Sequence, residues 1–191
     1  FETHGYALDR NIYISLMGTG KENVMKVFKE KYGENLPIIE MYKEKDEKLL
    51  DRVKRRLVPI KDGAYELLNY LKENNFKIAL ATSSRRERLD LQIKMFDIFE
   101  MFDAIVCGED VINGKPNPEI FLKASEKLGV APKDCIVIED SLAGIKGAYA
   151  GGMIGFHVQD LKIADEDILR YCNKNFMNLK EIKDYISEVF K

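Results

Sequence analysis

Apolar positions in the first 58 residues recur every three or four positions, which is the period of an amphipathic helix. One such pattern covers residues 24–28 and stops at Gly33, and a second covers residues 39–57. Asp46 is the one polar member of the second apolar stripe, and charged residues fill the other faces. Since no strand pattern precedes Pro59, we expect this part of the chain to be entirely helical.

The pattern changes after a Pro-Ile-Lys-Asp-Gly break at residues 59–63, which we interpret as a hinge. Beyond it, short apolar runs alternate with helical patterns. Strands are expected at residues 78–81, 104–107, 136–138, 154–158 and 176–178, and helices at 64–73, 88–96, 118–128, 141–150 and 182–190. This alternation is typical of an α/β fold, in which helices cover both faces of a parallel sheet.

Composition narrows the class of protein. A chain of 191 residues with 46% hydrophobic and 32% charged residues has room for one α/β domain and a subdomain. The net charge of -2 gives no bulk attraction for nucleic acid or anionic membranes. No apolar run approaches the ~20 residues of a membrane span. We therefore expect a cytoplasmic monomer that binds neither nucleic acid nor membrane.

The three cysteines, Cys107, Cys135 and Cys172, are odd in number, far apart and without CxxC spacing. This arrangement favours reduced thiols over a disulfide framework or a zinc site.

Two adjacent carboxylates, Glu139 and Asp140, end the strand expected at residues 136–138. Like charges at the end of a buried strand repel each other, so we expect a cation there, and a hard divalent cation such as Mg²⁺ suits carboxylate oxygens. Ligands of open α/β sheets bind at this edge. The alternative is an acidic helix start, which accounts for Asp140 or Ser141 but not for the pair.

Thr82, Ser83, Ser84 and Arg85 follow the strand expected at residues 78–81. Hydroxyl groups, free amides and a guanidinium suit a tetrahedral oxyanion such as phosphate. The alternative interpretation is a Ser- and Thr-rich helix cap without a ligand.

Lys115 lies in the sequence Gly-Lys-Pro-Asn-Pro, where the following proline restricts its backbone. A lysine held in this way can neutralise a phosphoryl group as a point charge. The alternative is an ordinary solvated lysine in a loop.

The three motifs in this order resemble the haloacid dehalogenase-like hydrolase superfamily. Residues 78–84 resemble its second motif, residues 114–121 its third, and residues 136–153 its fourth, in the form of the β-phosphoglucomutase and sugar-phosphate phosphatase branch. The resemblance implies a Rossmann-like core with a helical cap. We expect residues 1–58 to form the cap and residues 59–191 the core.

The resemblance also implies a Mg²⁺-dependent mechanism through an aspartyl-phosphate. Thr82 and the Ser83 amide would bind the transferring phosphoryl group, and Lys115 would neutralise it. Glu139 and Asp140 would hold Mg²⁺. Such chemistry consists mainly of positioning and charge neutralisation.

The first motif of the family is an Asp-x-Asp run after the first core strand, and we expect no such run anywhere in these residues. The resemblance implies that this strand lies between the strands at residues 78–81 and 136–138. We expect the nucleophile and the acid/base aspartate to lie upstream of this chain, and a segment outside it to fill the gap. The chain as it stands is not expected to hydrolyse a phosphate ester.

The resemblance suggests substrate contacts in the cap. Lys21 stands where β-phosphoglucomutase presents an arginine to the substrate phosphate, and Lys45 lies near a cap lysine of that enzyme. Ser84 and Arg85 fall where the mutase binds a second phosphate. These positions favour a small phosphorylated sugar, although both lysines also fit an ordinary charged helix surface. His4 and His157 are given no role.

Three functional hypotheses follow from these patterns. The first is a Mg²⁺-dependent phosphatase of small phosphorylated metabolites, and the second is a β-phosphoglucomutase that shares every core residue with it. The third is a non-catalytic relative without the nucleophile. The retained Lys115, Glu139 and Asp140 argue against the third, because adjacent buried acids are costly without a function.

Overall fold

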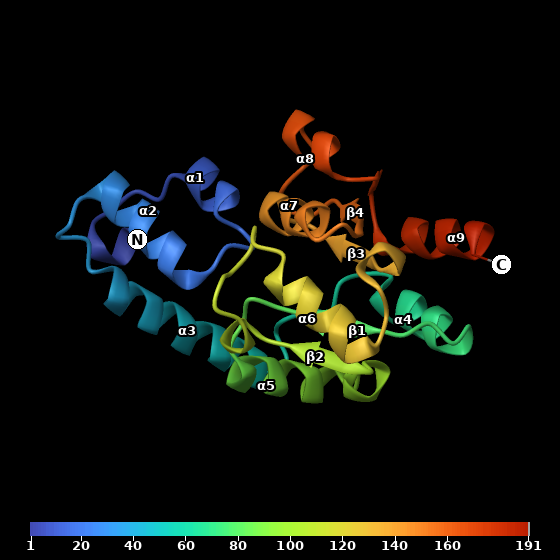
Figure 1. The fold of residues 1–191 in the computed structure, drawn as a ribbon. Helices are drawn as coiled ribbons and strands as arrows, with labels where there is room; N and C mark the ends of the chain where they lie inside the picture. Colours follow the sequence, from blue (N-terminus) through green and yellow to red (C-terminus); the bar gives the residue numbers. More distant parts are fainter. Residues whose placement is uncertain (191) are drawn as a thin grey trace.

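The computed structural model describes residues 1–190 and shows a helical part beside an α/β part (Figure 1). The helical part comprises η1 (Glu2–His4), α1 (Arg10–Ser15), α2 (Lys21–Tyr32) and α3 (Ile38–Lys54). It has its own apolar core, built from Leu16, Phe28, Leu36, Ile38 and Met41. The expected all-helical segment before Pro59 is therefore present.

The α/β part alternates strands and helices from α4 (Ala64–Glu73) to the end of the described chain. Its strands are β1 (Ala79–Ala81), β2 (Ala104–Val106), β3 (Ile136–Glu139), β4 (Ile154–Val158) and β5 (Lys174–Phe176). Its other helices are α5 (Arg86–Phe96), α6 (Glu119–Leu128), α7 (Leu142–Ala150), α8 (Glu166–Tyr171) and α9 (Leu179–Val189). Short 3₁₀ turns lie at η2 (Phe99–Met101), η3 (Gly108–Asp110) and η4 (Pro132–Asp134).

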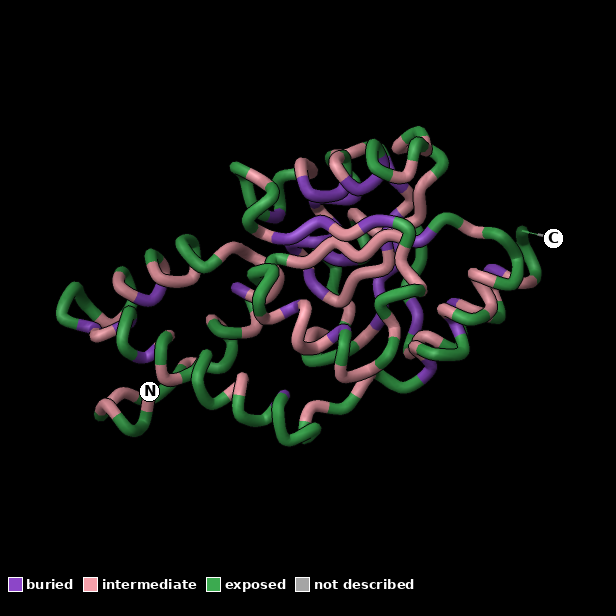
Figure 2. The backbone as a smooth tube through the Cα atoms, turned by 90° about the horizontal axis from the view of Figure 1, so that it is seen from below, coloured by how far each residue is buried: buried purple, intermediate pink, exposed green. Residues whose placement is uncertain are grey.

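All strand pairings among these elements are parallel, which confirms the α/β class. β1 pairs with β2, and β3, β4 and β5 form a second sheet in that order. Helices α6 and α7 contribute to one apolar cluster with β2 and β3, whereas α4 and α9 contribute to another with β4 and β5. The buried residues accordingly concentrate along the strands and the helix faces packed on them (Figure 2).

The two sheets do not pair with each other within residues 1–190. β1 and β3 each have one hydrogen-bonded neighbour, and a cavity of about 650 Å³ lies between them. Residues of both strands line this cavity, together with the apolar side chains of Phe121, Ile186 and Phe190. We call it the slot. It lies where the sequence analysis expected a further strand.

The sequence analysis gave no bounds for two short helices, α1 in the segment expected to be helical and α8 near the end of the chain. Each has six residues, fewer than two turns, which is too short to show a clear apolar period. Their N-caps supply the missing signal. Asp9 accepts hydrogen bonds from the amides of Asn11 and Ile12, and Asp165 accepts one from the amide of Ile168.

Cys107, Cys135 and Cys172 have free thiol groups in the structure. Among residues 1–190, no helix combines the length and the apolar character that crossing a membrane requires.

Candidate functional site

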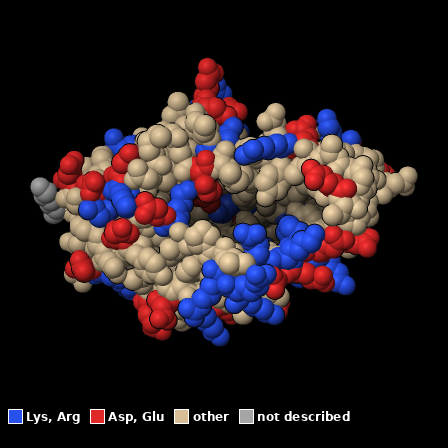
Figure 3. Space-filling model, turned by 180° about the vertical axis from the view of Figure 1, so that it is seen from behind, with Lys and Arg blue, Asp and Glu red and all other residues tan. Residues whose placement is uncertain are grey.

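A pocket of about 600 Å³ lies between the helical part and the α/β part. It is lined by all the residues that the sequence analysis singled out as candidates: Lys21, Lys45, Thr82, Ser83, Ser84, Arg85, Lys115, Glu139 and Asp140. On the face drawn in Figure 3, Lys and Arg side chains gather beside a hollow in the surface. The structure thus brings the three motifs together, while the role of each residue remains a prediction.

The buried end of the pocket is formed where β3 meets the start of α7. The Nζ of Lys115 pairs with Glu139 Oε1, and these side chains are 5% and 11% exposed. The other carboxylate oxygen of Glu139 accepts hydrogen bonds from Ser141 Oγ at 2.9 Å and Ser141 N at 3.3 Å. Ser141 in turn caps α7 by accepting from Gly144 N at 3.0 Å. Lys115 is therefore a buried, ion-paired residue and not a solvated loop lysine.

Two glycines allow the backbone to approach this buried end closely. A Cβ on Gly144 would lie 2.1 Å from the carboxylate carbon of Glu139. A Cβ on Gly18, whose φ is +77°, would lie 2.2 Å from Ser141 Oγ. The helical part thus reaches Ser141, which donates to this carboxylate, through the Gly18 loop, and neither glycine has room for a side chain.

Asp140 presents a different carboxylate to the pocket. Burial raises its pKa, and the negative charge of Glu139 raises it further. Asp140 forms no side-chain ion pair within residues 1–190, and its own backbone amide and the charge of Lys61 lower its pKa by less than burial and Glu139 raise it. Loss of solvation without a partner is the situation in which a carboxylate gains most from a cation.

The backbone of Asp140 is held by a buried histidine. His157 Nε2 lies 3.3 Å from the carbonyl oxygen of Asp140, and its Nδ1 lies 2.7 Å from the side-chain oxygen of Asn175. This chain of contacts links β5, β4 and the end of β3. The sequence analysis gave His157 no role, because one histidine within an apolar strand carries no distinguishing pattern.

The loop after β1 holds the hydroxyl groups. Thr82 N donates to Val106 O at 3.0 Å, and Thr82 Oγ1 accepts from Ser84 N at 3.1 Å. Ser83 Oγ donates to Gly18 O at 3.2 Å, which joins this loop to the helical part. None of these hydroxyl groups caps α5, whose N-cap is Arg85 without a side-chain bond. The simple helix-cap interpretation was therefore wrong.

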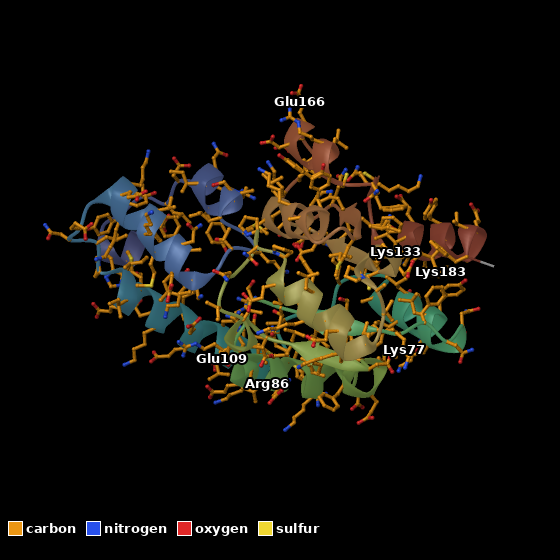
Figure 4. All side chains as sticks on the ribbon, in the orientation of Figure 1. Lys77, Arg86, Glu109, Lys133, Glu166 and Lys183 are labelled. Atoms are coloured by element: carbon orange, nitrogen blue, oxygen red, sulfur yellow. The ribbon has the colours of Figure 1, made fainter. Side chains whose placement is uncertain are left out.

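The start of α5 is fixed from the other side by η3. Arg86 and Glu109, labelled in Figure 4, come from these two elements. Glu109 Oε2 accepts from the backbone amide of Arg86 at 3.0 Å. This contact ties the first turn of α5 to the loop after β2 and so restricts the candidate anion-binding loop.

The open end of the pocket is lined from both parts of the chain. The ammonium groups of Lys21 and Lys45 lie 4.9 and 4.3 Å from the ring centre of Tyr42. Burial and the nearby charge of Asp46 raise the pKa of Tyr42 to about 12. The sequence analysis missed Tyr42 as a pocket residue because it also belongs to the apolar stripe of α3.

Arg88 is a second pocket residue that the sequence analysis missed. Its guanidinium donates to Ser84 Oγ and lies 3.7 Å from the carboxylate of Asp46. No sequence pattern marks Arg88, because Ser84 lies before the helix and helical spacing does not link the two residues.

The residues at the buried end fit a magnesium ion in part. Residues 1–190 contain no group of three or more His, Cys, Asp or Glu side chains that could enclose a metal. Mg²⁺, however, is commonly held by one or two carboxylates, with waters and substrate phosphate oxygens as the other ligands. Asp140 lines the pocket without an ion-pair partner in residues 1–190, whereas both carboxylate oxygens of the neighbouring Glu139 are already engaged.

The chain contains one Asp-x-Asp spacing, Asp165–Glu166–Asp167, and it is not part of this site. Asp165 caps α8 and pairs with Lys162 on the surface, and Glu166 lies at the top of the view in Figure 4. No Asp-x-Asp motif of the chain therefore lines the pocket.

Comparison with known proteins agrees with this geometry. Residues 1–158 match the family model of the haloacid dehalogenase-like hydrolases. A phosphorylated carbohydrates phosphatase of Thermotoga maritima is 32% identical over 153 residues, which cover 80% of this chain and 70% of that protein. A probable pseudouridine-5'-phosphatase of Drosophila melanogaster is 32% identical over 171 residues, covering 86% and 73%.

Solved structures show the same relationship. The β-phosphoglucomutase of Clostridium difficile superposes with a TM-score of 0.80 at 26% identity, covering 98% of this chain and 84% of that one. A β-phosphoglucomutase-like protein of Thermotoga maritima gives a TM-score of 0.73 at 27% identity, covering 98% and 87%. The chain belongs to the haloacid dehalogenase-like hydrolase family, in the branch of phosphatases and phosphomutases that includes these proteins.

Proposed function

We propose that the protein is a Mg²⁺-dependent phosphomonoester hydrolase that acts on a small phosphorylated metabolite of the sugar phosphate class. The observation that carries the proposal is the convergence of Thr82, Lys115 and the Glu139–Asp140 pair on one pocket. These groups come from three different strand ends, so their meeting is a property of the fold. The names of the similar phosphatases support the substrate class.

Different residues of the pocket would bind the oxygens of a phosphoryl group and offset its charge. The Thr82 hydroxyl and the Ser83 amide would donate hydrogen bonds to its oxygens, and the Lys115 ammonium would offset its charge. Glu139 and Ser141 keep Lys115 in place at low exposure, where electrostatic interactions are weakly screened. Preorganised charges of this kind stabilise the transition state of phosphoryl transfer without rearrangement during the reaction.

Asp140 and Glu139 would hold the magnesium ion, which neutralises phosphate charge when bound. Asp140 is the better direct ligand because it lines the pocket and, unlike Glu139, forms no ion pair within residues 1–190. Glu139 is ion-paired with Lys115 and would bind the magnesium ion directly or through a water molecule. The rise in the pKa of Asp140 caused by burial and Glu139 supports a cation between these acids.

The nucleophile is proposed to come from a further strand in the slot. The slot and the pocket share three lining residues, Leu80, Ala81 and Glu139. A parallel strand between β1 and β3 would therefore end at the pocket, because parallel strands end at the same edge of a sheet. A carboxylate just beyond that end would lie beside Lys115 and Thr82. The slot supports such a strand from outside residues 1–191, as the resemblance implies.

A β-phosphoglucomutase activity is the second candidate. The structural similarity to the Clostridium difficile enzyme favours it. The basic open end of the pocket, with Lys21, Ser84 and Arg85, is a place where a second phosphate could bind. Hydrolase and mutase share every residue of the buried end, so only an assay separates them.

The test is an assay of the full-length gene product. Phosphate release from a panel of sugar phosphates is measured with Mg²⁺ and with a chelator, and isomerisation of β-glucose 1-phosphate is measured in parallel. We expect Mg²⁺-dependent phosphate release that falls at least about a hundredfold in Lys115→Gln, because the transferring group loses its charge partner. Lys26→Gln, an exposed helix position, is the matched control. Full activity of Lys115→Gln would refute the proposal, and isomerisation without phosphate release would establish the mutase.

A further inference from the structure

One carboxylate lies among the basic groups at the open end of the pocket. Asp46, in α3, is 2.9 Å from the ammonium of Lys45 and 3.7 Å from the guanidinium of Arg88. Lys45 belongs to the helical part and Arg88 to α5 of the α/β part. Asp46 is thus the anion that the two cations share across the mouth of the pocket.

The two cations are themselves held in place. The Tyr42 ring contacts Lys45 and Lys21, and Arg88 donates to Ser84 Oγ. The Lys45, Asp46 and Arg88 side chains are 51%, 50% and 31% exposed, so a ligand can reach them. All of them line the pocket whose buried end holds Lys115 and Asp140.

We infer that Asp46 is a specificity-determining residue. Its carboxylate occupies the position between Lys45 and Arg88 where an anion would bind. It therefore selects phosphorylated sugars that place a hydroxyl group, and not a second phosphate, at the open end of the pocket. The inference rests on the proposed function, because it assumes that the substrate phosphate binds beside Lys115. It assigns substrate choice to a residue that no motif marks.

A second phosphate and the Asp46 carboxylate would compete for the same two cations, Lys45 and Arg88. A second phosphate at the open end would have to displace the Asp46 carboxylate from its two cations, or lie beside it and be repelled. A hydroxyl group meets neither obstacle, because it can donate a hydrogen bond to the Asp46 carboxylate. Rejection of like charge is a common way in which a site separates related ligands.

The pocket offers a matched control for this argument. Glu87, in α5, also lines the pocket and also carries one negative charge. It takes part in no ion pair within residues 1–190. Glu87→Gln therefore changes the net charge of the pocket as Asp46→Asn does, but without freeing Lys45 or Arg88.

The test compares binding of glucose 6-phosphate and glucose 1,6-bisphosphate by calorimetry, at fixed ionic strength and without divalent cations so that turnover does not intervene. We expect Asp46→Asn to raise the affinity for the bisphosphate relative to the monophosphate about tenfold, and Glu87→Gln to change this ratio less than about twofold. Circular dichroism of each variant, and Asp46→Ser as a second substitution, check that the fold is retained.

The outcomes separate the two claims. An unchanged or lower ratio in Asp46→Asn and Asp46→Ser, with monophosphate binding intact, overturns the role of Asp46 alone. An equal rise in Glu87→Gln also overturns it, because the effect would then be one of net charge. Failure of the full-length protein to release phosphate from any sugar phosphate with Mg²⁺ contradicts the proposed function, and the inference falls with it.

Discussion

At the scale of single residues, the account depends on Asp140, the carboxylate with no charge partner in the described chain. In the full-length protein, we expect Asp140→Asn to lower phosphatase activity at least about a hundredfold, because the variant loses a negatively charged oxygen ligand for Mg²⁺. The remaining activity should need a higher Mg²⁺ concentration for half-maximal rate. A Mg²⁺ titration of the rate checks this, and unchanged activity at low Mg²⁺ would show that the metal assignment is wrong.

The same carboxylate predicts a dependence of stability on pH. Because the pKa of Asp140 is raised in the folded state, the folded protein binds more protons than the unfolded chain between the ordinary Asp pKa and the raised value. The contribution of Asp140 to stability therefore falls as pH rises through this window, and stays low above it. Without Mg²⁺, Asp140→Asn should melt at a higher temperature than the unmodified protein at pH 7, and the difference should shrink at mildly acidic pH.

Thermal melts at several pH values with a chelator measure this effect. Added Mg²⁺ should stabilise the unmodified protein and not Asp140→Asn. If Asp140→Asn were less stable than the unmodified protein at pH 7 without metal, the Asp140 charge would not destabilise the folded state, contrary to this account.

Gly144 tests the close packing at the buried end. A methyl group there would overlap the Glu139 carboxylate, so Gly144→Ala should lower the free energy of unfolding by about 1–3 kcal/mol and reduce activity. Gly20→Ala is the control, since Gly20 has φ -68° and open space around its Cα. Chemical denaturation of both variants checks this, and equal stability of the two would mean that Glu139 does not lie over Gly144.

At the scale of elements, the sequence analysis was most successful where apolar runs were long or bounded by special residues. Helix α3 and strand β4 were predicted to within about three residues at each end. Elements fixed by local capping, such as α1 and α8, were given no bounds, and β5 was placed two residues late. The split of the sheet was anticipated only through the family resemblance, because no strand pattern reveals an absent neighbour.

The slot gives the prediction that belongs to this scale. An isolated peptide of about six β-branched residues followed by aspartate should bind between β1 and β3 and raise the melting temperature of the 191-residue chain as its concentration rises. A peptide of the same composition with a central proline should not, because proline cannot complete the ladder. No shift, or equal shifts with both peptides, would show that the slot does not accept a strand.

At the scale of the whole molecule, the pocket is a product of how two parts of the chain meet. The helical part contributes Lys21, Lys45 and the Gly18 loop, and the α/β part contributes the three strand ends. The motifs predicted which residues of the α/β part would converge, because parallel strands end at one edge. The contacts of Arg88 and Asp46 could not be predicted, since they depend on how the helical part packs on α5.

The central claim is that Thr82, Lys115 and the Glu139–Asp140 pair together bind a phosphoryl group and its cation. Its most direct test is a crystal structure of the full-length protein with Mg²⁺ and tungstate, an anion whose tungsten is located by anomalous scattering. The account predicts tungstate within hydrogen-bond distance of Thr82 and Lys115, with Mg²⁺ on the Asp140 carboxylate. Tungstate bound elsewhere, with the Lys115–Glu139 end of the pocket empty of anion and metal, would contradict it.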